Sequence, residues 1–113
     1  MFYSKYKAKK TVIDGITFDS KTEAKRYQEL KLIERAGHIQ HLSLQPRFML
    51  QEGFVNIHTG KKERAIEYVA DFMYLENSVI IVEDCKGFKT SDYKIKRKLF
   101  IYQYQDKYKH IET

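Results

Sequence analysis

The chain has 113 residues, of which 42% are hydrophobic and 14% aromatic, and it carries a formal net charge of +6. This length and composition predict one globular domain over residues 1–113 and exclude a disordered chain. With no apolar run near the roughly 18 residues of a bilayer-spanning helix, no signal-peptide pattern and a single cysteine, Cys85, the protein is expected in a cytoplasm.

The sequence of the N-terminal part indicates a basic arm followed by a β-hairpin. Residues 1–10 are rich in lysine and form the arm. Residues 11–18, TVIDGITF, contain two β-branched runs around Asp14-Gly15, a dipeptide that is typical of a tight hairpin turn. The core of the domain is therefore expected to begin after this hairpin and to cover residues 20–112.

A helix is predicted to follow the hairpin directly. Ser20 is its expected N-cap, Glu23 stands three residues later as in a capping box, and Gly37 supplies the stop. Apolar side chains recur at helical spacing between these signals, so one side of the helix should pack against a sheet. The members of this apolar side are Ala24, Tyr27, Leu30, Ile33 and Ala36.

Three strands are predicted next, as an antiparallel meander. Residues 42–51 and 64–75 both alternate in the way that strands do, and a polar stretch around residues 58–61 joins them. A tight turn at Glu76-Asn77 then leads into a strand that begins with VIIV, residues 79–82. This third strand has no polar alternation, so both of its faces should be covered.

A second helix and a last strand complete the predicted fold. The helix covers about residues 92–104, with Ile95, Leu99 and Tyr102 on one side, and the strand covers residues 108–112. The final strand–helix–strand step should be a right-handed parallel crossover. The predicted fold class is α/β: a small mixed β-sheet flanked by helices, in the order α-β-β-β-α-β, preceded by the hairpin.

The third strand ends in a cluster of charged residues. Its apolar run leads directly into Glu83 and Asp84, and Lys86 follows. The predicted two-residue turn places Asp71 opposite Val82 and diagonal to Asp84, and the period of two adds Lys86 to the same face. A loop one residue longer would set Asp71 against Glu83 instead.

This arrangement is typical of a metal site that acts on phosphate. Asp71 and Asp84 repel each other unless a cation lies between them, and their oxygens suit Mg²⁺ or Mn²⁺. Lys86 could orient an attacking water or offset charge on phosphorus. Glu23, in the first turn on the inward side of its helix, fits two roles, as a helix cap and as a further carboxylate for the same metal.

The order of these residues resembles the PD-(D/E)xK nuclease superfamily, which includes restriction enzymes, archaeal Holliday-junction resolvases and phage recombination nucleases. The motifs are Glu23 on the helix, VAD ending in Asp71, and VEDCKG with Asp84 and Lys86. The likeness covers nearly the whole chain after the hairpin and is strongest to a small phage-encoded branch. It implies a restriction-endonuclease-like core, Glu23, Asp71, Asp84 and the main-chain carbonyl of Cys85 as metal ligands, and Lys86 as the catalytic lysine.

The implied activity is a Mg²⁺-dependent (or Mn²⁺-dependent) endonuclease that hydrolyses DNA phosphodiester bonds. It would select branched or nicked DNA in phage recombination, replication or packaging, in the host cytoplasm. Cutting two strands requires two sites, which favours a homodimer. The family's proline is replaced by Ala70. The alternative is a nucleic-acid-binding module without catalysis, in which Asp84 and Lys86 form a structural ion pair.

The second helix carries positive charge that suits a nucleic acid. Its basic side chains could contact phosphates beside the site, although a solvated helix face explains them equally well. The candidates for DNA binding are Lys89, Lys94, Arg97 and Lys98.

The histidines and the cysteine show no metal-binding spacing. Cys85, with Glu83, should point away from the face of Asp84, and we expect it to be a small buried side chain. The four histidines stand among polar or turn residues and are expected at the surface. They are His38, His41, His58 and His110.

Overall fold

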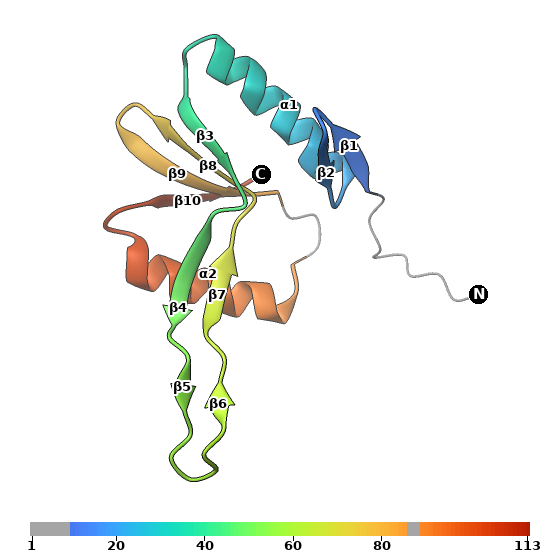
Figure 1. Cartoon of the computed structure of the whole chain (residues 1–113). Helices are drawn as coiled ribbons and strands as arrows, with labels where there is room; N and C mark the ends of the chain where they lie inside the picture. Colours follow the sequence, from blue (N-terminus) through green and yellow to red (C-terminus); the bar gives the residue numbers. More distant parts are fainter. Residues whose placement is uncertain (1–9, 86–88) are drawn as a thin grey trace, which may run out of the picture.

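The described part of the chain is a mixed α/β fold centred on a four-stranded sheet (Figure 1). The structure is a computed structural model and describes residues 10–85 and 89–113, so most of the predicted basic arm and Lys86 lie outside the described residues. The sheet has the strand order β10-β9-β8-β3. Its strands are β3 (Gln40–Leu44), β8 (Phe72–Glu76), β9 (Val79–Asp84) and β10 (Lys109–Glu112).

The strand directions agree with the predicted mixed sheet. β8 runs antiparallel to both β3 and β9, whereas β10 is parallel to β9. Between these two parallel strands the chain forms α2 (Ser91–Tyr104), so the predicted strand–helix–strand order is confirmed. A parallel pair requires such a crossover, because a hairpin turn can join only antiparallel neighbours.

The N-terminal hairpin forms as predicted and packs on the first helix. β1 (Thr11–Ile13) and β2 (Ile16–Phe18) pair around Asp14 and Gly15, whose φ angles of 53° and 75° are the left-handed values that this turn needs. The Phe18 ring lies 5.0 Å from the Tyr27 ring, and the Tyr27 hydroxyl donates to Asp14 at 3.1 Å. The hairpin therefore contacts the helix both at its turn, through Asp14, and at the end of its second strand, through Phe18.

The first helix, α1 (Lys21–Arg35), begins and ends at the predicted signals. Ser20 accepts a hydrogen bond from the Glu23 N–H at 3.1 Å, and Gly37 has a φ of 83° just after the helix. Its inward residues Ala24, Tyr27 and Leu30 are buried, as the spacing predicted, although Ala36 at the end is exposed. This side packs against the sheet in a cluster that includes Phe72 and Ile81.

Two of the predicted strands are each broken in the middle, which corrects the predicted meander. The segment 42–51 divides into β3 and β4 (Arg47–Gln51), and the segment 64–75 divides into β7 (Ile66–Val69) and β8. The breaks lie side by side, because Gln45 N–H donates to the Asp71 carbonyl at 3.0 Å and Ala70 N–H donates to the Pro46 carbonyl at 3.1 Å. Pro46 has no N–H for a continuous ladder, so both strands bend together at this point.

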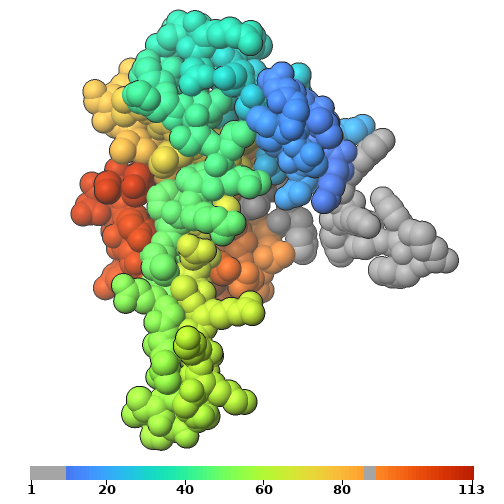
Figure 2. Space-filling view, in the orientation of Figure 1, coloured from blue at the N-terminus to red at the C-terminus, as the bar shows by residue number. Residues whose placement is uncertain are grey.

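Beyond the bend, β4 and β7 form a separate two-stranded sheet. This sheet extends into a projecting β-hairpin, called the arm below and distinct from the basic arm predicted at the N-terminus. The arm consists of β5 (Phe54–Val55) and β6 (Lys62–Glu63), and it projects away from the rest of the molecule (Figures 1 and 2). Its side chains are exposed, including Ile57, which is 88% exposed near the tip. The arm is consequently the part of the fold with the least contact to a core.

The second helix covers the opposite face of the structure from α1. Phe100 is its fully buried residue and packs with Phe48, Tyr68 and Val82. In β9 the last four residues are buried, whereas Val79 is exposed, so coverage on both faces is confirmed only for the end of this strand. The apolar residues of α2 that the spacing grouped on one side lie toward solvent: Ile95, Leu99 and Tyr102.

Candidate functional site

The turn between β8 and β9 lies one residue later than predicted. Its two central residues are Asn77 and Ser78, with φ angles of 50° and 68°, so Phe72 rather than Asp71 pairs near the end of β9, opposite Glu83. Two consecutive residues with positive φ form the turn that best matches the twist of a hairpin. Successive residues of a strand face opposite sides of a sheet, so Glu83 and Asp84 do so as predicted.

Asp71 lies at the bend between β7 and β8 and is 9% exposed. Its N–H donates to the Glu83 carbonyl at 3.2 Å, and its carboxylate accepts the Cys85 N–H at 2.7 Å. Cys85 follows Asp84 directly in the chain. The structure therefore brings Asp71 to the end of β9, although by a bend and a side-chain hydrogen bond rather than by regular strand pairing.

Glu23 shares a small pocket with Asp71. The pocket has a volume of about 140 Å³, and its other walls come from the hairpin and from the end of β3. Glu23 is 8% exposed, and its backbone N–H makes the capping bond to Ser20. The Ser20 half of the predicted capping box is therefore formed.

Asp84 is fully buried on the α2 side of the sheet. The Tyr68 hydroxyl donates a hydrogen bond to its Oδ2 atom. The His110 Nε2 atom lies 3.2 Å from the same Oδ2 and 2.7 Å from the Tyr68 hydroxyl oxygen. Asp84 thus belongs to a compact group of three polar side chains from three different strands.

The position of His110 corrects the prediction that every histidine is at the surface. His38, His41 and His58 are exposed, but the His110 side chain is only 3% exposed. The parallel pairing of β10 with β9 sets His110 beside Val82, which puts its ring on the face of Asp84. Tyr68 and His110 were both missed, because their roles depend on a pairing register that the sequence does not reveal.

Glu83, on the opposite face, has a structural set of partners. It is fully buried and accepts hydrogen bonds from Arg26 at 2.6 and 3.1 Å, from the Tyr74 hydroxyl at 2.6 Å and from Thr113 at 3.0 Å. Burial alone would raise the pKa of Glu83, but the bonds from Arg26 and Tyr74 outweigh burial and leave that pKa below its ordinary value. Glu83 therefore stays ionised and joins α1 to the sheet.

Cys85 was predicted to be a small buried side chain, and the structure shows it half-buried. It packs against the cluster on the α1 side, and burial raises the pKa of its thiol to about 12. The thiol is accordingly neutral near pH 7 and unsuited to nucleophilic chemistry. Its main-chain carbonyl keeps the role of metal ligand only as a prediction, and the predicted role of Lys86 lies outside the described residues.

The predicted DNA-binding residues divide into two pairs. Lys89 and Arg97 lie 3.9 and 3.6 Å from the carboxylate of Glu112, which also accepts a hydrogen bond from Tyr93 at 2.6 Å. Glu112 is the strand partner of Asp84, so this first pair adjoins the site. Lys94 and Lys98 form the second pair, and they are exposed one helical turn apart on α2.

The donor atoms of the site suit a hard cation. Across residues 10–85 and 89–113, no three His, Cys, Asp or Glu side chains form a ready metal-binding group. A zinc site would need such a group, whereas Mg²⁺ is commonly held by one or two carboxylates and several waters. Glu23 and Asp71 lie in one pocket and meet that smaller requirement. Asp71 also accepts a hydrogen bond from the N–H of Cys85, the residue that follows Asp84.

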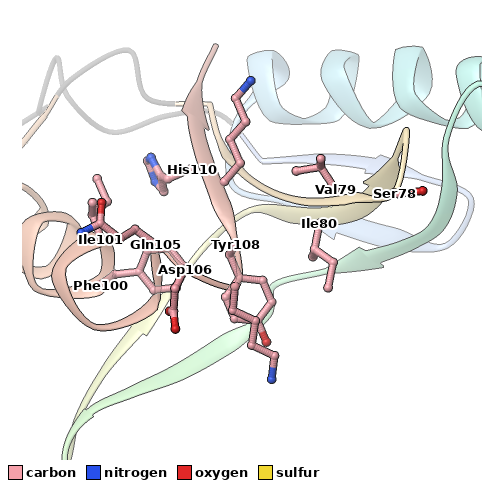
Figure 3. A pocket seen from close by; sticks show the side chains of 11 residues that line it. Ser78, Val79, Ile80, Phe100, Ile101, Gln105, Asp106, Tyr108 and His110 are labelled. Carbon is pink, nitrogen blue, oxygen red and sulfur yellow. The ribbon is translucent and has the colours of Figure 1, made fainter.

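A wider pocket lies elsewhere, between the end of α2 and the beginning of β9 and β10 (Figure 3). It has a volume of about 530 Å³, and its walls include Ser78, Lys107 and Tyr108. His110 also lines it and is the one residue that it shares with the group around Asp84. None of the predicted carboxylates lines this wider pocket.

Comparisons with known proteins place the chain in a family. Neither curated proteins nor solved structures include a significant match to it. In the described residues, no helix has both the length and the apolar character for crossing a membrane. A family model described as "Protein of unknown function (DUF1064)" matches residues 3–112. Because that match covers almost the entire sequence, the chain belongs to the DUF1064 family.

Proposed function

We propose that this protein is a Mg²⁺-dependent or Mn²⁺-dependent endonuclease of the PD-(D/E)xK type, acting on branched or nicked DNA. The supporting observation is that two buried acidic residues of the motif lie at the open end of the β8–β9 hairpin, with a third beside one of them. Asp71 and Asp84 are buried at this end, and Glu23 shares a pocket with Asp71. Burying a carboxylate is costly unless it is paired, so buried carboxylates close to one another support a site that uses them.

The chain's own residues would divide the work as the motif predicts. Glu23, Asp71 and Asp84 would hold the metal together with the carbonyl of Cys85, and Lys86 would orient the attacking water. A bound Mg²⁺ would polarise the phosphodiester and lower the pKa of a coordinated water. The buried surroundings of Glu23, Asp71 and Asp84 would strengthen each electrostatic contact, because the effective dielectric is low there.

The exposed lysines of α2 would bind DNA next to this site. Lys94 and Lys98 are exposed, and the helix begins a few residues after Asp84. Such contacts go to phosphates and position a duplex without reading its sequence. Selection by DNA shape rather than by sequence follows from this arrangement, and two copies of the chain would supply one site for each strand.

Cleavage of a DNA panel tests the proposal. Branched, flapped, nicked and linear substrates would be incubated with Mg²⁺ or Mn²⁺ and wild-type protein, Asp84→Asn or Glu76→Gln. Glu76→Gln is the matched control, because it removes a carboxylate at the far end of the same hairpin. We expect wild-type and Glu76→Gln proteins to cut and Asp84→Asn to bind without cutting. Equal cleavage by Asp84→Asn would contradict the assignment of the site.

A second function is favoured by one observation. The carboxylate of Asp84 already accepts a hydrogen bond from Tyr68 and adjoins His110, as a purely structural buried carboxylate would. On this reading the protein binds nucleic acid without cutting it. Salt-dependent binding of branched DNA by the wild-type protein, with no cleavage in either metal ion, would establish this second function instead.

A further inference from the structure

The group around Asp84 contains two polar side chains that the sequence motif does not include. Tyr68 comes from β7, in the separate two-stranded sheet, and His110 comes from β10, which is the neighbour of β9 in the main sheet. Both contacts reach the same carboxylate oxygen, Oδ2. Two contacts on one oxygen restrict the rotation of the carboxylate about its side-chain bonds.

The hydrogen atoms of this group can be assigned from its geometry. Tyr68 has one hydroxyl proton, and it is donated to Asp84. The His110 Nε2 atom lies within hydrogen-bond distance of both the Tyr68 and the Asp84 oxygens. With the phenol proton donated to Asp84, the tautomer that completes the group is the one with hydrogen on Nε2. His110 is therefore a donor into the same group.

Ring packing holds the side chains of the two donors, Tyr68 and His110, in place. The Tyr68 ring lies 4.9 Å from the Phe100 ring and 6.3 Å from the Phe48 ring, all of them buried. The His110 ring lies 5.9 Å from both Tyr68 and Phe100, and Figure 3 shows it on the α2 side of its strand. Side chains held in this way present their donors in one direction only.

We propose that Tyr68 and His110 are positioning residues that hold Asp84 in the orientation in which it binds the catalytic metal ion. This inference rests on the proposed nuclease function and extends it from the motif carboxylates to the side chains behind them. Donors that orient a ligating group are a general feature of metal sites, and losing one typically costs about 10–100-fold in metal affinity or activity. In this proposal both residues act through Asp84, to which each is hydrogen-bonded.

Glu83 and Tyr74 provide a matched comparison on the other face of the same strand. The Tyr74 hydroxyl donates to the buried Glu83 carboxylate at 2.6 Å, just as Tyr68 donates to Asp84. Tyr68→Phe and Tyr74→Phe therefore each remove one buried phenol–carboxylate hydrogen bond. Only the first of these bonds acts on a proposed metal ligand, so the pair separates a loss of stability from a loss of metal positioning.

The experiment measures Mn²⁺ binding separately from cleavage. Free Mn²⁺ would be titrated by electron paramagnetic resonance with the full chain as wild type, Tyr68→Phe, Tyr74→Phe, His110→Leu, His110→Gln and Asp84→Asn. Thermal unfolding would be recorded for every variant. His110→Gln is the conservative variant, because its side-chain amide can place an N–H near the position of Nε2. Cleavage of branched DNA would be assayed in parallel.

We expect Tyr68→Phe and His110→Leu to weaken Mn²⁺ binding and cleavage by about 10–100-fold. His110→Gln should recover most of this loss, and Tyr74→Phe should lower the melting temperature while leaving Mn²⁺ affinity unchanged. Wild-type affinity and cleavage in Tyr68→Phe and His110→Leu, beside an inactive Asp84→Asn, would overturn the positioning role and leave the nuclease function intact. A wild-type protein that neither binds Mn²⁺ nor cuts DNA would overturn the nuclease function and this inference together.

Discussion

The carboxylate of Asp71 accepts a hydrogen bond from the backbone N–H of Cys85 at 2.7 Å. The bond connects the bend between β7 and β8 to the residue that follows Asp84 at the end of β9. One side chain therefore closes the open end of the β8–β9 hairpin and also carries a proposed metal-binding oxygen. The two roles can be separated by substitution, because an amide can accept the same hydrogen bond without carrying charge.

Asp71→Asn and Asp71→Ala should differ in stability but not in activity. Asparagine keeps an acceptor for the Cys85 N–H, whereas alanine leaves that N–H unsatisfied at a cost of about 1–3 kcal/mol. Both substitutions remove the charge that would bind the metal, so both should reduce cleavage at least about 100-fold. Denaturant unfolding and a nicking assay measure the two effects. Wild-type cleavage by Asp71→Asn would remove Asp71 from the proposed metal site.

Arg26→Met should destabilise the fold by about 3 kcal/mol, because it leaves the buried carboxylate of Glu83 without its main cationic partner. The Arg26 Nε atom lies 2.6 Å from Glu83, whose side chain is fully buried. Lys31→Met is the matched control, since Lys31 and Glu34 form a more exposed pair at 3.2 Å on the same helix. That control should cost less than about 1 kcal/mol in the free energy of unfolding. Equal losses in the two variants would show that Glu83 does not depend on Arg26.

The stability of the protein should fall in acid partly through Glu83. Its pKa in the folded protein lies below the ordinary value of 4.5, despite burial, because Arg26 and Tyr74 bond to the ionised form. The resulting stabilisation is fully present above pH 4.5 and is lost as the pH falls through the lowered pKa. Unfolding free energies measured from pH 7 to pH 3 should show this loss, and Glu83→Gln should flatten it. A Glu83→Gln curve parallel to that of the wild type would contradict the prediction.

Replacing Lys94 and Lys98 by serine should weaken DNA binding and make it less dependent on salt. Each lysine that contacts a phosphate adds nearly one unit to the slope of log affinity against log salt, so the slope should fall by about 2. The control is Lys61→Ser with Lys62→Ser, which changes the net charge by the same amount. Lys62 begins strand β6 of the arm, and Lys61 precedes it. Fluorescence anisotropy at several salt concentrations measures both double variants. Equal effects would mean that affinity follows net charge and not the surface of α2.

Much of the candidate site could be predicted because its residues stand in recognisable local contexts. Glu23 follows a helix N-cap, and Asp84 ends an apolar strand that the structure confirms. The predicted register placed Asp71 diagonal to Asp84, and the real turn is displaced by one residue. Asp71 still reaches the end of β9, through the bend between β7 and β8 and the hydrogen bond that its carboxylate accepts from the Cys85 N–H.

Other parts of the site could not be predicted. His110 was expected at the surface, since a short polar strand gives no sign of what lies beside it. Its burial follows from the pairing of β10 with β9, which joins segments about thirty residues apart in the chain. The break at Asp71 follows in the same way from Pro46, which is distant in sequence and adjacent in space.

The sequence by itself determined the local elements of this protein: the Asp14-Gly15 turn, the helix that begins after Ser20, and the second helix before the last strand. These elements depend on the conformational preferences and hydrogen bonds of residues within a few positions of one another. Only the tertiary structure decided where the long strands bend and which side chains surround Asp84. Those features depend on contacts between distant segments, where a shift of one or two residues in register changes every partner.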